Sequence, residues 1–305
     1  MNKHKILVAD DYGKKFYDEL ARYGEVVKAT DVDDDIQLDD VTMLVVRSKT
    51  KVNEELVNRM RNLKCVITAT HGIDHVDVNC LKEKGIEFYN IPVQSYDIAQ
   101  GVIAYILAHS TNLVEGDRSM KRGEWKKKKL MGCRIKGKTL GIIGYGRIGK
   151  EVARMASALE MNVVVYDPYV KSEIAVTLNE LLEASDFITI HVPLTEKTKH
   201  MIGKNEISKM KDGAHLINTS RGGVIDEEAL LDALHRGKLS GVALDVYEHH
   251  PPFENKLSNR LIKDKRVIAT PHSIGQTIEA IEEKGEGVLK IIKDYIRRRH
   301  SLKIV

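Results

Sequence analysis

The sequence predicts an α/β protein with two doubly wound parallel-sheet domains and a cleft between them. Short β-branched runs alternate with amphipathic stretches along nearly the whole chain, a pattern typical of parallel strands joined by helical crossovers. The strand-like runs are mostly apolar, as expected for strands that are covered by helices on both faces. The chain has 305 residues, which is long enough for two cores of ordinary size.

A first series of apolar runs predicts the first domain. Its strand candidates are KILVAD, TMLVVRS, KCVITAT and IEFYN, with the helical stretch EELVNRM between two of them. We expect residues 1–95 to belong to this domain. Residues 96–138 lack a strand signal; their helical periodicity gives way to basic residues, which indicates a connecting helix followed by an arm.

A second series predicts the second domain, over residues 96–275. Its strand candidates are TLGIIG, NVVVYD, FITIHVP, AHLINTS, GVALDV and RVIATPH. A last helical stretch at about 276–298 has no strand after it. We expect it to pack on the first domain, which would then be discontinuous and comprise residues 1–95 and 276–305.

Composition and charge exclude several function classes. The net charge is +4, from 48 basic and 44 acidic residues, so we expect no nucleic-acid partner, and we interpret Lys126–Lys129 as a solvated face. No apolar run approaches the ~20 residues of a membrane span, and the N-terminus lacks a signal-peptide pattern. The 3 cysteines have no metal-ligand spacing, which favours reduced thiols in a cytoplasmic protein without a metal site.

The strongest local motif is TLGIIGYGRIGKEVARMASALEMNVVVYDP. Gly144, Gly146 and Gly149 form GxGxxG between an apolar strand and a helix, where the backbone can approach a pyrophosphate. Arg147 and Ile148 lie within this turn, and we include both among the expected cofactor contacts. Asp167 follows the next strand and can accept hydrogen bonds from a ribose, which favours NAD over NADP. The pattern predicts a Rossmann NAD-binding domain.

Polar residues follow the later strand candidates of the second domain. They are His191, Pro193, Asn218 to Arg221, Asp245 and His272. Because ligands bind at the carboxyl ends of strands in open α/β sheets, we expect these residues to converge on whatever reacts with the dinucleotide.

These motifs support a family resemblance over nearly the full chain. TSRGGVIDEEALLDAL, GVALDVYE and ATPH, together with GYGRIG and YDP, resemble the D-isomer-specific 2-hydroxyacid dehydrogenase family. More narrowly, MKRGEWKKKKLMGCRIKGKTLGIIGYGRIGKEVA and VVRSKTKV look like its phosphoglycerate dehydrogenase branch. The resemblance implies a flavodoxin-like substrate domain beside the NAD domain and a homodimer. Because the sequence ends just after the last helical stretch, we expect a short form without a C-terminal regulatory domain.

The resemblance also implies roles for individual residues. Arg221 matches the arginine that holds the substrate carboxylate, which suits a planar bidentate donor. His272 matches the acid/base histidine, and an imidazole suits proton exchange near neutral pH. Thr219 and Asp245 match contacts to the nicotinamide end of the cofactor, as His191 and Pro193 do for the dinucleotide. In the first domain, Arg47 matches the position that binds a substrate phosphate.

Several positions depart from the family pattern. In LDVYEHHPPF, His250 stands where the family has the glutamate that pairs with the catalytic histidine, and Glu248 lies two residues too early. We include His250 in the predicted catalytic set and expect it to lower the working pKa of His272. In ITATHGIDHVD, Thr68 replaces a second arginine, while His71 and Gly72 belong to the expected substrate loop.

The sequence therefore predicts an NAD-dependent oxidoreductase that transfers a hydride between NAD(H) and a D-2-hydroxy acid/2-keto acid pair. The leading substrate pair is 3-phosphoglycerate and 3-phosphohydroxypyruvate, which would place the enzyme in serine biosynthesis. Two alternatives stay open, because of the changes at positions 68 and 250. One is a reductase of glyoxylate, hydroxypyruvate or another short 2-keto acid. The other is a catalytically weakened protein that senses NAD(H).

Overall fold

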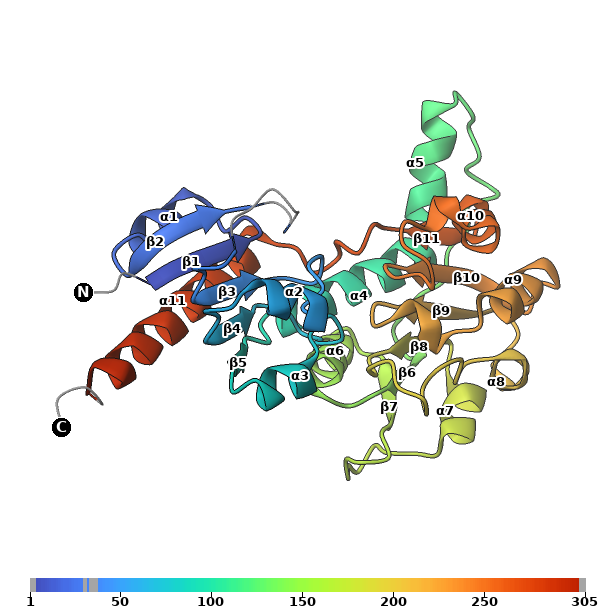
Figure 1. The fold of residues 1–305 in the computed structure, drawn as a ribbon. Helices are drawn as coiled ribbons and strands as arrows, with labels where there is room; N and C mark the ends of the chain where they lie inside the picture. Colours follow the sequence, from blue (N-terminus) through green and yellow to red (C-terminus); the bar gives the residue numbers. More distant parts are fainter. Residues whose placement is uncertain (1–3, 30–31, 33–37, 302–305) are drawn as a thin grey trace. The chain divides into compact units, whose positions relative to one another are not determined.

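The computed structural model describes residues 4–29, 32 and 38–301 of the chain. The chain divides into two compact units, residues 1–94 with 277–305 and residues 95–276 (Figure 1). Both units are parallel-sheet α/β domains, which confirms the predicted fold class. Among the described residues, no helix is long and apolar enough to cross a membrane.

The first unit has a parallel sheet in the order β2-β1-β3-β4-β5, the flavodoxin-like arrangement. Its elements are β1 (His4–Ala9), α1 (Lys14–Leu20), β2 (Gly24–Lys28), β3 (Met43–Val46), α2 (Glu54–Arg59), β4 (Cys65–Thr68), α3 (Val78–Glu83), β5 (Glu87–Asn90) and α11 (Ile278–Ser301). β2 was not among the strands expected from sequence. It is a half-buried edge strand of 5 residues, so its hydrophobic signal is weak.

Helices cover both faces of this sheet. Alternate residues of the strands point to opposite faces: Leu7 and Leu44 pack with α2 and α3, whereas Ile6 and Met43 pack with α1 and α11. Helix α11, drawn in red in Figure 1, thus belongs to the core of the first unit although it lies at the end of the chain. The reason is that the sheet face left bare by α1 alone needs a second apolar helix.

The second unit has a parallel sheet in the order β11-β10-β9-β8-β6-β7. Its elements are α4 (Ser95–Ser110), α5 (Leu113–Lys121), β6 (Thr139–Ile143), α6 (Arg147–Ala158), β7 (Asn162–Tyr166), α7 (Leu178–Ala184), β8 (Phe187–Ile190), α8 (Lys204–Lys209), β9 (Ala214–Asn218), α9 (Glu227–His235), β10 (Leu239–Leu244), α10 (Lys256–Lys263) and β11 (Val267–Ala269), with 3-10 turns at Gly222–Val224 and Pro252–Glu254. A parallel bridge between Val165 and Ala175 adds a trace of a further strand beside β7. That is where the doubly wound dinucleotide fold has its third strand.

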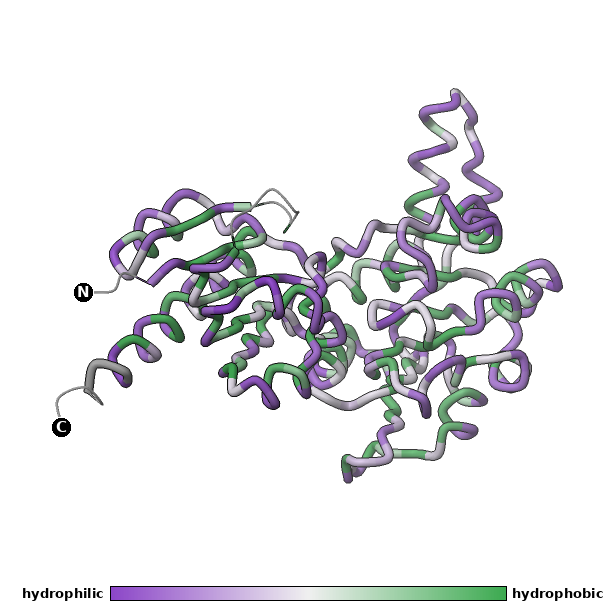
Figure 2. The backbone as a smooth tube through the Cα atoms, viewed as in Figure 1, coloured by the Kyte–Doolittle hydropathy of each residue, from purple (hydrophilic) through white to green (hydrophobic). Residues whose placement is uncertain are grey.

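Two cores flank this second sheet. One face packs against α4 and α6 through residues such as Val102 and Val152. The other packs against α7, α8, α9 and α10. Helix α5 and the segment that returns from it, together residues 113–135 and called the arm below, extend away from the sheet (Figure 1). Figure 2 shows the arm as mostly hydrophilic.

Candidate active site

The glycine turn lies between β6 and α6. A Cβ atom added to Gly144, whose φ is +95°, would lie 2.7 Å from the carbonyl oxygen of His191, and one added to Gly149 would lie 2.2 Å from that of Gly144. Both positions therefore need glycine for packing. At Gly146, an added Cβ would meet no heavy atom of the described chain within 4 Å. This middle glycine faces open space.

The N-terminus of α6 is suited to an anion. Gly146 is its N-cap, and among the described residues no side chain caps the helix there. Its first N–H groups, those of Arg147 and Ile148 included, are therefore left for another acceptor. Arg147 is exposed, whereas Ile148 is half-buried against the core beneath the turn.

Asp167 lies at the end of β7 and borders the same turn. Its Oδ2 accepts a hydrogen bond from the backbone N–H of Tyr145 at 2.8 Å, and its Oδ1 accepts one from Tyr169 at 2.9 Å. Each carboxylate oxygen has a second lone pair, so the group remains able to accept ribose hydroxyls. The side chain is thereby fixed beside the site where the pyrophosphate would lie.

The remaining predicted residues of this unit follow the carboxyl ends of successive strands. His191 follows β8, and its Nε2 is 3.0 Å from the Thr189 hydroxyl. Pro193 is exposed, and its carbonyl accepts a hydrogen bond from Thr198 at 2.6 Å. Thr219 follows β9, and among the described residues its buried hydroxyl has no hydrogen-bond partner. A buried polar atom of this kind is expected to meet a ligand or water.

Arg221 is placed by a turn at the end of β9. The Asn218 side chain accepts hydrogen bonds from the N–H and hydroxyl of Ser220 and donates to the Arg221 carbonyl at 3.0 Å. Directly after it, a Cβ at Gly222 would lie 1.9 Å from the carbonyl carbon of Tyr247. The absence of a side chain at Gly222 thus allows the turn after β9 to pack closely against the loop after β10.

Asp245 organises the loop that carries His272. The carboxylate is buried, and its Oδ1 accepts hydrogen bonds from the N–H groups of Ser273 at 2.9 Å and Ile274 at 3.3 Å, and from the Thr270 hydroxyl. His272 adopts a φ of +54°, an uncommon backbone conformation for a non-glycine residue. The hydrogen bonds to Asp245 and the positive φ of His272 together fix the position of this imidazole after the end of β11.

The ring of His250 stacks on the ring of His272. Their centroids are 6.2 Å apart, and their planes differ by 22°. Tyr247 contacts the same group: its ring lies edge-on to that of His250 at 6.1 Å, and its hydroxyl donates to the carbonyls of Leu244 at 3.1 Å and Thr270 at 2.9 Å. The structure therefore brings together two predicted catalytic histidines from two different loops.

The surroundings lower the pKa of both imidazoles. For His272, the protein packed around the ring is the largest cause, and Arg221 and His250 add to it, whereas Asp245 opposes it. For His250, desolvation again leads, Arg221 and His249 act in the same direction, and Glu227 opposes them. Replacing water by protein disfavours the charged imidazolium. The sequence hypothesis named His250 as the cause of a lowered pKa of His272; His250 acts in that direction, after desolvation and Arg221.

The second unit, which holds this arrangement, matches the model of a known protein family. The model of the D-isomer specific 2-hydroxyacid dehydrogenase NAD binding domain matches residues 103–273, more than half of the chain. The chain belongs to the D-isomer-specific 2-hydroxyacid dehydrogenase family. The matched region contains both the glycine turn and the two stacked histidines.

The relatives of this chain are named for several activities. A D-3-phosphoglycerate dehydrogenase of Methanocaldococcus jannaschii is 42% identical over 96% of this chain and 57% of its own length. A hydroxypyruvate reductase of Thermotoga maritima is 40% identical over 96% of this chain and 92% of its own length. A solved D-lactate dehydrogenase from Aquifex aeolicus, complexed with NAD and lactic acid, is 33% identical with a TM-score of 0.87 over 96% of both chains. The chain spans about half the length of the phosphoglycerate dehydrogenases it matches.

The family model that the second unit matches is that of an NAD-binding domain, so NAD is the cofactor of this chain. The structure fits it in three places: the helix N-terminus at Gly146 for the pyrophosphate, the carboxylate of Asp167 for a ribose, and the buried hydroxyl of Thr219 for a polar group of the ligand. An acid at the end of β7 disfavours the additional phosphate of NADP, because the two negative charges repel each other.

The predicted substrate residues of the first unit lie at the carboxyl ends of its strands. Nη1 of Arg47 lies 3.2 Å from Oδ1 of Asp10, and only 16% of the arginine side chain is exposed. Nδ1 of His71 lies 3.4 Å from the Val93 carbonyl, and Gly72 accepts a hydrogen bond from the Thr70 hydroxyl at 2.7 Å. These residues belong to a different compact unit from Arg221 and His272.

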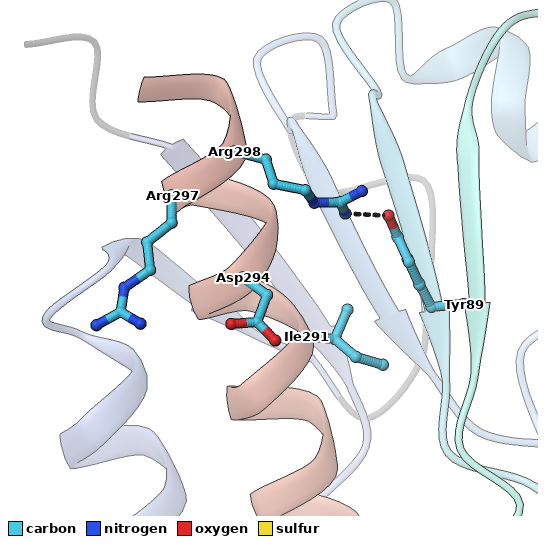
Figure 3. Close-up of a pocket in the computed structure, with 5 residues that line it drawn as sticks. All are labelled: Tyr89, Ile291, Asp294, Arg297 and Arg298. Atoms are coloured by element: carbon cyan, nitrogen blue, oxygen red, sulfur yellow. Dashed lines mark hydrogen bonds between the residues drawn. The ribbon is translucent and has the colours of Figure 1, made fainter. Parts of the chain in front are cut away.

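A pocket of about 500 Å³ also lies in the first unit, between β5 and α11 (Figure 3). It is lined by Tyr89, Ile291, Asp294, Arg297 and Arg298. Arg298 donates to the Tyr89 hydroxyl at 2.5 Å and lies 3.5 Å from Glu87, so its charge is already engaged. None of the predicted site residues lines this pocket, and we assign it no part in the dehydrogenase reaction.

Sequence reasoning missed one buried acid close to the site. Glu227, in the first turn of α9, accepts hydrogen bonds from Glu248 and Ser258. In the sequence it resembles an ordinary acidic residue at a helix start, next to the N-cap Asp226. Its partners are 21 and 31 residues further along the chain, so no local pattern could have revealed them.

Proposed function

We propose that this dehydrogenase interconverts a D-2-hydroxy acid and its 2-keto acid, with Arg221 holding the substrate carboxylate and His272 moving the hydroxyl proton. The observation that carries this proposal is the anchoring of the His272 loop by the buried carboxylate of Asp245. The His272 imidazole in this loop is close enough to Arg221 for the guanidinium charge to act on it. Bound NAD supplies the hydride acceptor, or NADH the donor. In oxidation, His272 takes the proton from the hydroxyl oxygen as the carbonyl forms, and in reduction it returns that proton.

The chain's own residues determine the direction in which proton transfer is easier. Reduction requires a protonated His272, and its lowered pKa decreases the imidazolium fraction at neutral pH. Oxidation requires the neutral ring, which the same shift favours. We therefore expect reduction to lose rate at a lower pH than it would with an unshifted imidazole.

For the substrate, 3-phosphoglycerate with 3-phosphohydroxypyruvate is the leading pair, which would place the enzyme in serine biosynthesis. Relatives named D-3-phosphoglycerate dehydrogenase, at 42% and 41% identity, support it. Arg47 supports it as well, since a guanidinium at the carboxyl end of β3 can bind a phosphate bidentately.

A second candidate is a short 2-keto acid such as hydroxypyruvate or glyoxylate. The ion pair of Arg47 with Asp10 favours it, because a phosphate would have to compete with that carboxylate. Thr68 favours it too: its buried hydroxyl lies 2.9 Å from both Thr70 Oγ1 and His75 Nε2 and offers no positive charge. The match to the relative named hydroxypyruvate reductase also covers 92% of that relative's length.

Steady-state kinetics of the purified chain test both candidates. NADH oxidation is followed with 3-phosphohydroxypyruvate, hydroxypyruvate, glyoxylate and pyruvate, and kcat/KM is compared for the wild type and Arg47→Ala. A phosphate-specific enzyme loses most of its kcat/KM for 3-phosphohydroxypyruvate in Arg47→Ala and little for hydroxypyruvate. NADH binding without turnover of any of these acids would instead support the NAD(H) sensor.

We further propose that the protein is a cytoplasmic homodimer. The arm supports association, because Trp125 and Met131 expose 78% and 85% of their surface, and large exposed apolar side chains on an extended segment commonly mark an interface. The cytoplasmic location is supported by Cys65, Cys80 and Cys133, none of which forms a disulfide within the described part of the chain.

A further inference from the structure

Glu227 is a buried carboxylate that joins three segments around the predicted acid/base histidines. Its Oε1 accepts a hydrogen bond from the backbone N–H of Glu248 at 3.0 Å, and its Oε2 accepts one from the hydroxyl of Ser258 at 2.6 Å. The first donor belongs to the loop after β10 and the second to α10. A carboxylate with both oxygens bonded in this way keeps its orientation.

The loop that Glu227 holds is the one that carries His250. On one side, the absence of a Cβ at Gly222 allows the backbone of Tyr247 and Glu248 to approach closely. On the other, the Tyr247 hydroxyl bonds the carbonyl of Thr270, at the start of the His272 loop. Residues 247–248 therefore connect Glu227 to both rings of the stacked pair. Glu248 lies two residues before His250 in the same loop, and the Tyr247 hydroxyl bonds the start of the His272 loop.

The charges that face this pair come from a few groups. The groups that act on His250 are Glu227, Arg221 and His249, and those that act on His272 are Asp245, Arg221 and His250 itself. Glu248, which is closer to His250 in the sequence, instead lies 3.1 Å from Nε2 of His200. The carboxylate on α9, Glu227, favours a proton on His250.

We propose that Glu227 is a positioning residue of the acid/base pair. It anchors the loop that carries His250, and it supplies a negative charge to His250, whereas the carboxylate of Glu248 in that loop lies beside His200. This inference rests on the proposed function of His272. Glu227 acts without touching the substrate. Glu227 itself is buried, so water screens its charge less than it would screen that of a surface carboxylate.

The consequence for titration has a definite sign. Because the two rings interact, their protons are lost in two steps that belong to the pair. Removing a nearby negative charge weakens proton binding in both steps. In Glu227→Gln, the amide oxygen still accepts from the Glu248 N–H, so the anchor remains while the charge is lost.

Imidazole Cε1–H NMR titrations of the full chain test the proposal without depending on turnover. His250→Gln and His272→Gln assign the two resonances. We expect Glu227→Gln to shift the apparent pKa of the pair to lower values by about half a unit or more. Ser258→Ala is the matched control: it removes one hydrogen bond but leaves the charge, so its titration should match the wild type. An unchanged titration in Glu227→Gln, or an equal shift in Ser258→Ala, overturns the proposal.

A second measurement uses the wild-type protein and so does not depend on the folding of Glu227→Gln. The carboxyl ¹³C shift of Glu227 should follow the titration of His250, and this response should vanish in His250→Gln. A Glu227 carbon that does not sense the pair in the wild type contradicts the proposal. Kinetics separate the proposed function from the proposed role of Glu227. A wild-type protein that turns over none of the keto acids counts against the proposed function, whereas the NMR titrations decide the role of Glu227.

Discussion

The imidazole rings of His250 and His272 stack with 6.2 Å between their centroids and 22° between their planes. Protonation of both rings at the same time is unfavourable, because two positive charges at this separation repel each other. The proton available for reduction therefore depends on the state of both residues, and a carboxylate at position 250 would have the opposite effect on His272.

Replacing His250 by glutamate should raise the pKa of His272. A negative charge beside the ring stabilises the imidazolium, by about one pKa unit or more at close range. Since reduction needs the protonated ring, the fall of kcat/KM with rising pH should move to higher pH by a similar amount. The pH profile of keto-acid reduction measures this shift. His249 serves as control, because it is the His250 ring that stacks on His272: His249→Glu should give a much smaller change, and equal profiles for both variants would refute the expected coupling.

The three glycines of the turn should separate into packing and binding positions. Gly149→Ala should lower the melting temperature, because its Cβ would lie 2.2 Å from the carbonyl oxygen of Gly144. Gly146→Ala should fold normally, since its φ is −79° and no heavy atom of the described chain lies within 4 Å of the added Cβ. It should nevertheless bind NADH more weakly, because the methyl group occupies the space that a pyrophosphate would approach.

Thermal melting and NADH fluorescence titration of the two variants check this division. The expected result is a lower melting temperature for Gly149→Ala and a raised NADH dissociation constant at unchanged stability for Gly146→Ala. If Gly146→Ala bound NADH as tightly as the wild type, the anion site would not lie at this helix N-terminus.

A half-buried histidine pair should make stability depend on pH. His109 of α4 and His215 of β9 lie with ring centroids 5.1 Å apart. Burial is the main cause that lowers the pKa of each to about 4. Both rings are therefore neutral in the folded protein, while in the unfolded chain they bind protons below about pH 6.5. Stability contributed by keeping them neutral should be present above about pH 6.5 and decline as the pH falls toward 4.

Urea unfolding at several pH values tests this dependence. His109→Gln removes one titrating group of the pair, so its unfolding free energy should decline less steeply between about pH 6.5 and 4. The exposed His249→Gln provides a control that should follow the wild-type slope. Parallel curves for all three proteins would show that the half-buried pair does not determine acid stability.

The apolar side chains of the arm should control association. Trp125→Ser together with Met131→Ser removes the two most exposed large hydrophobic side chains of the arm, while the core of the second unit is untouched. If the arm forms the dimer interface, light scattering coupled to gel filtration should show the mass of the variant falling to that of one chain. A monomeric wild type, or a variant that stays dimeric, would exclude the arm as the main interface.

Much of this protein could be predicted from local sequence. The alternation of apolar runs with helical stretches predicts the fold class, because parallel strands buried on both faces must be apolar throughout. GxGxxG followed by an acid after the next strand predicts the dinucleotide turn, because each requirement there is local: close backbone approach, a helix N-terminus and a carboxylate. The departure at His250 was visible too, from its register against Pro251.

Only the tertiary structure decided how distant residues combine. Asp245 was expected to contact the cofactor, yet it also anchors the loop of His272, 27 positions further on (272 − 245). Likewise Glu227 reaches the backbone two residues before His250, and Arg47 pairs with Asp10 from a neighbouring strand. Hydrogen bonds and ion pairs between separate loops depend on which strands lie side by side, and that order arises from packing the whole sheet. The sequence by itself thus determined which chemical groups are present at the strand ends, and the fold decided which of them hold each other in place.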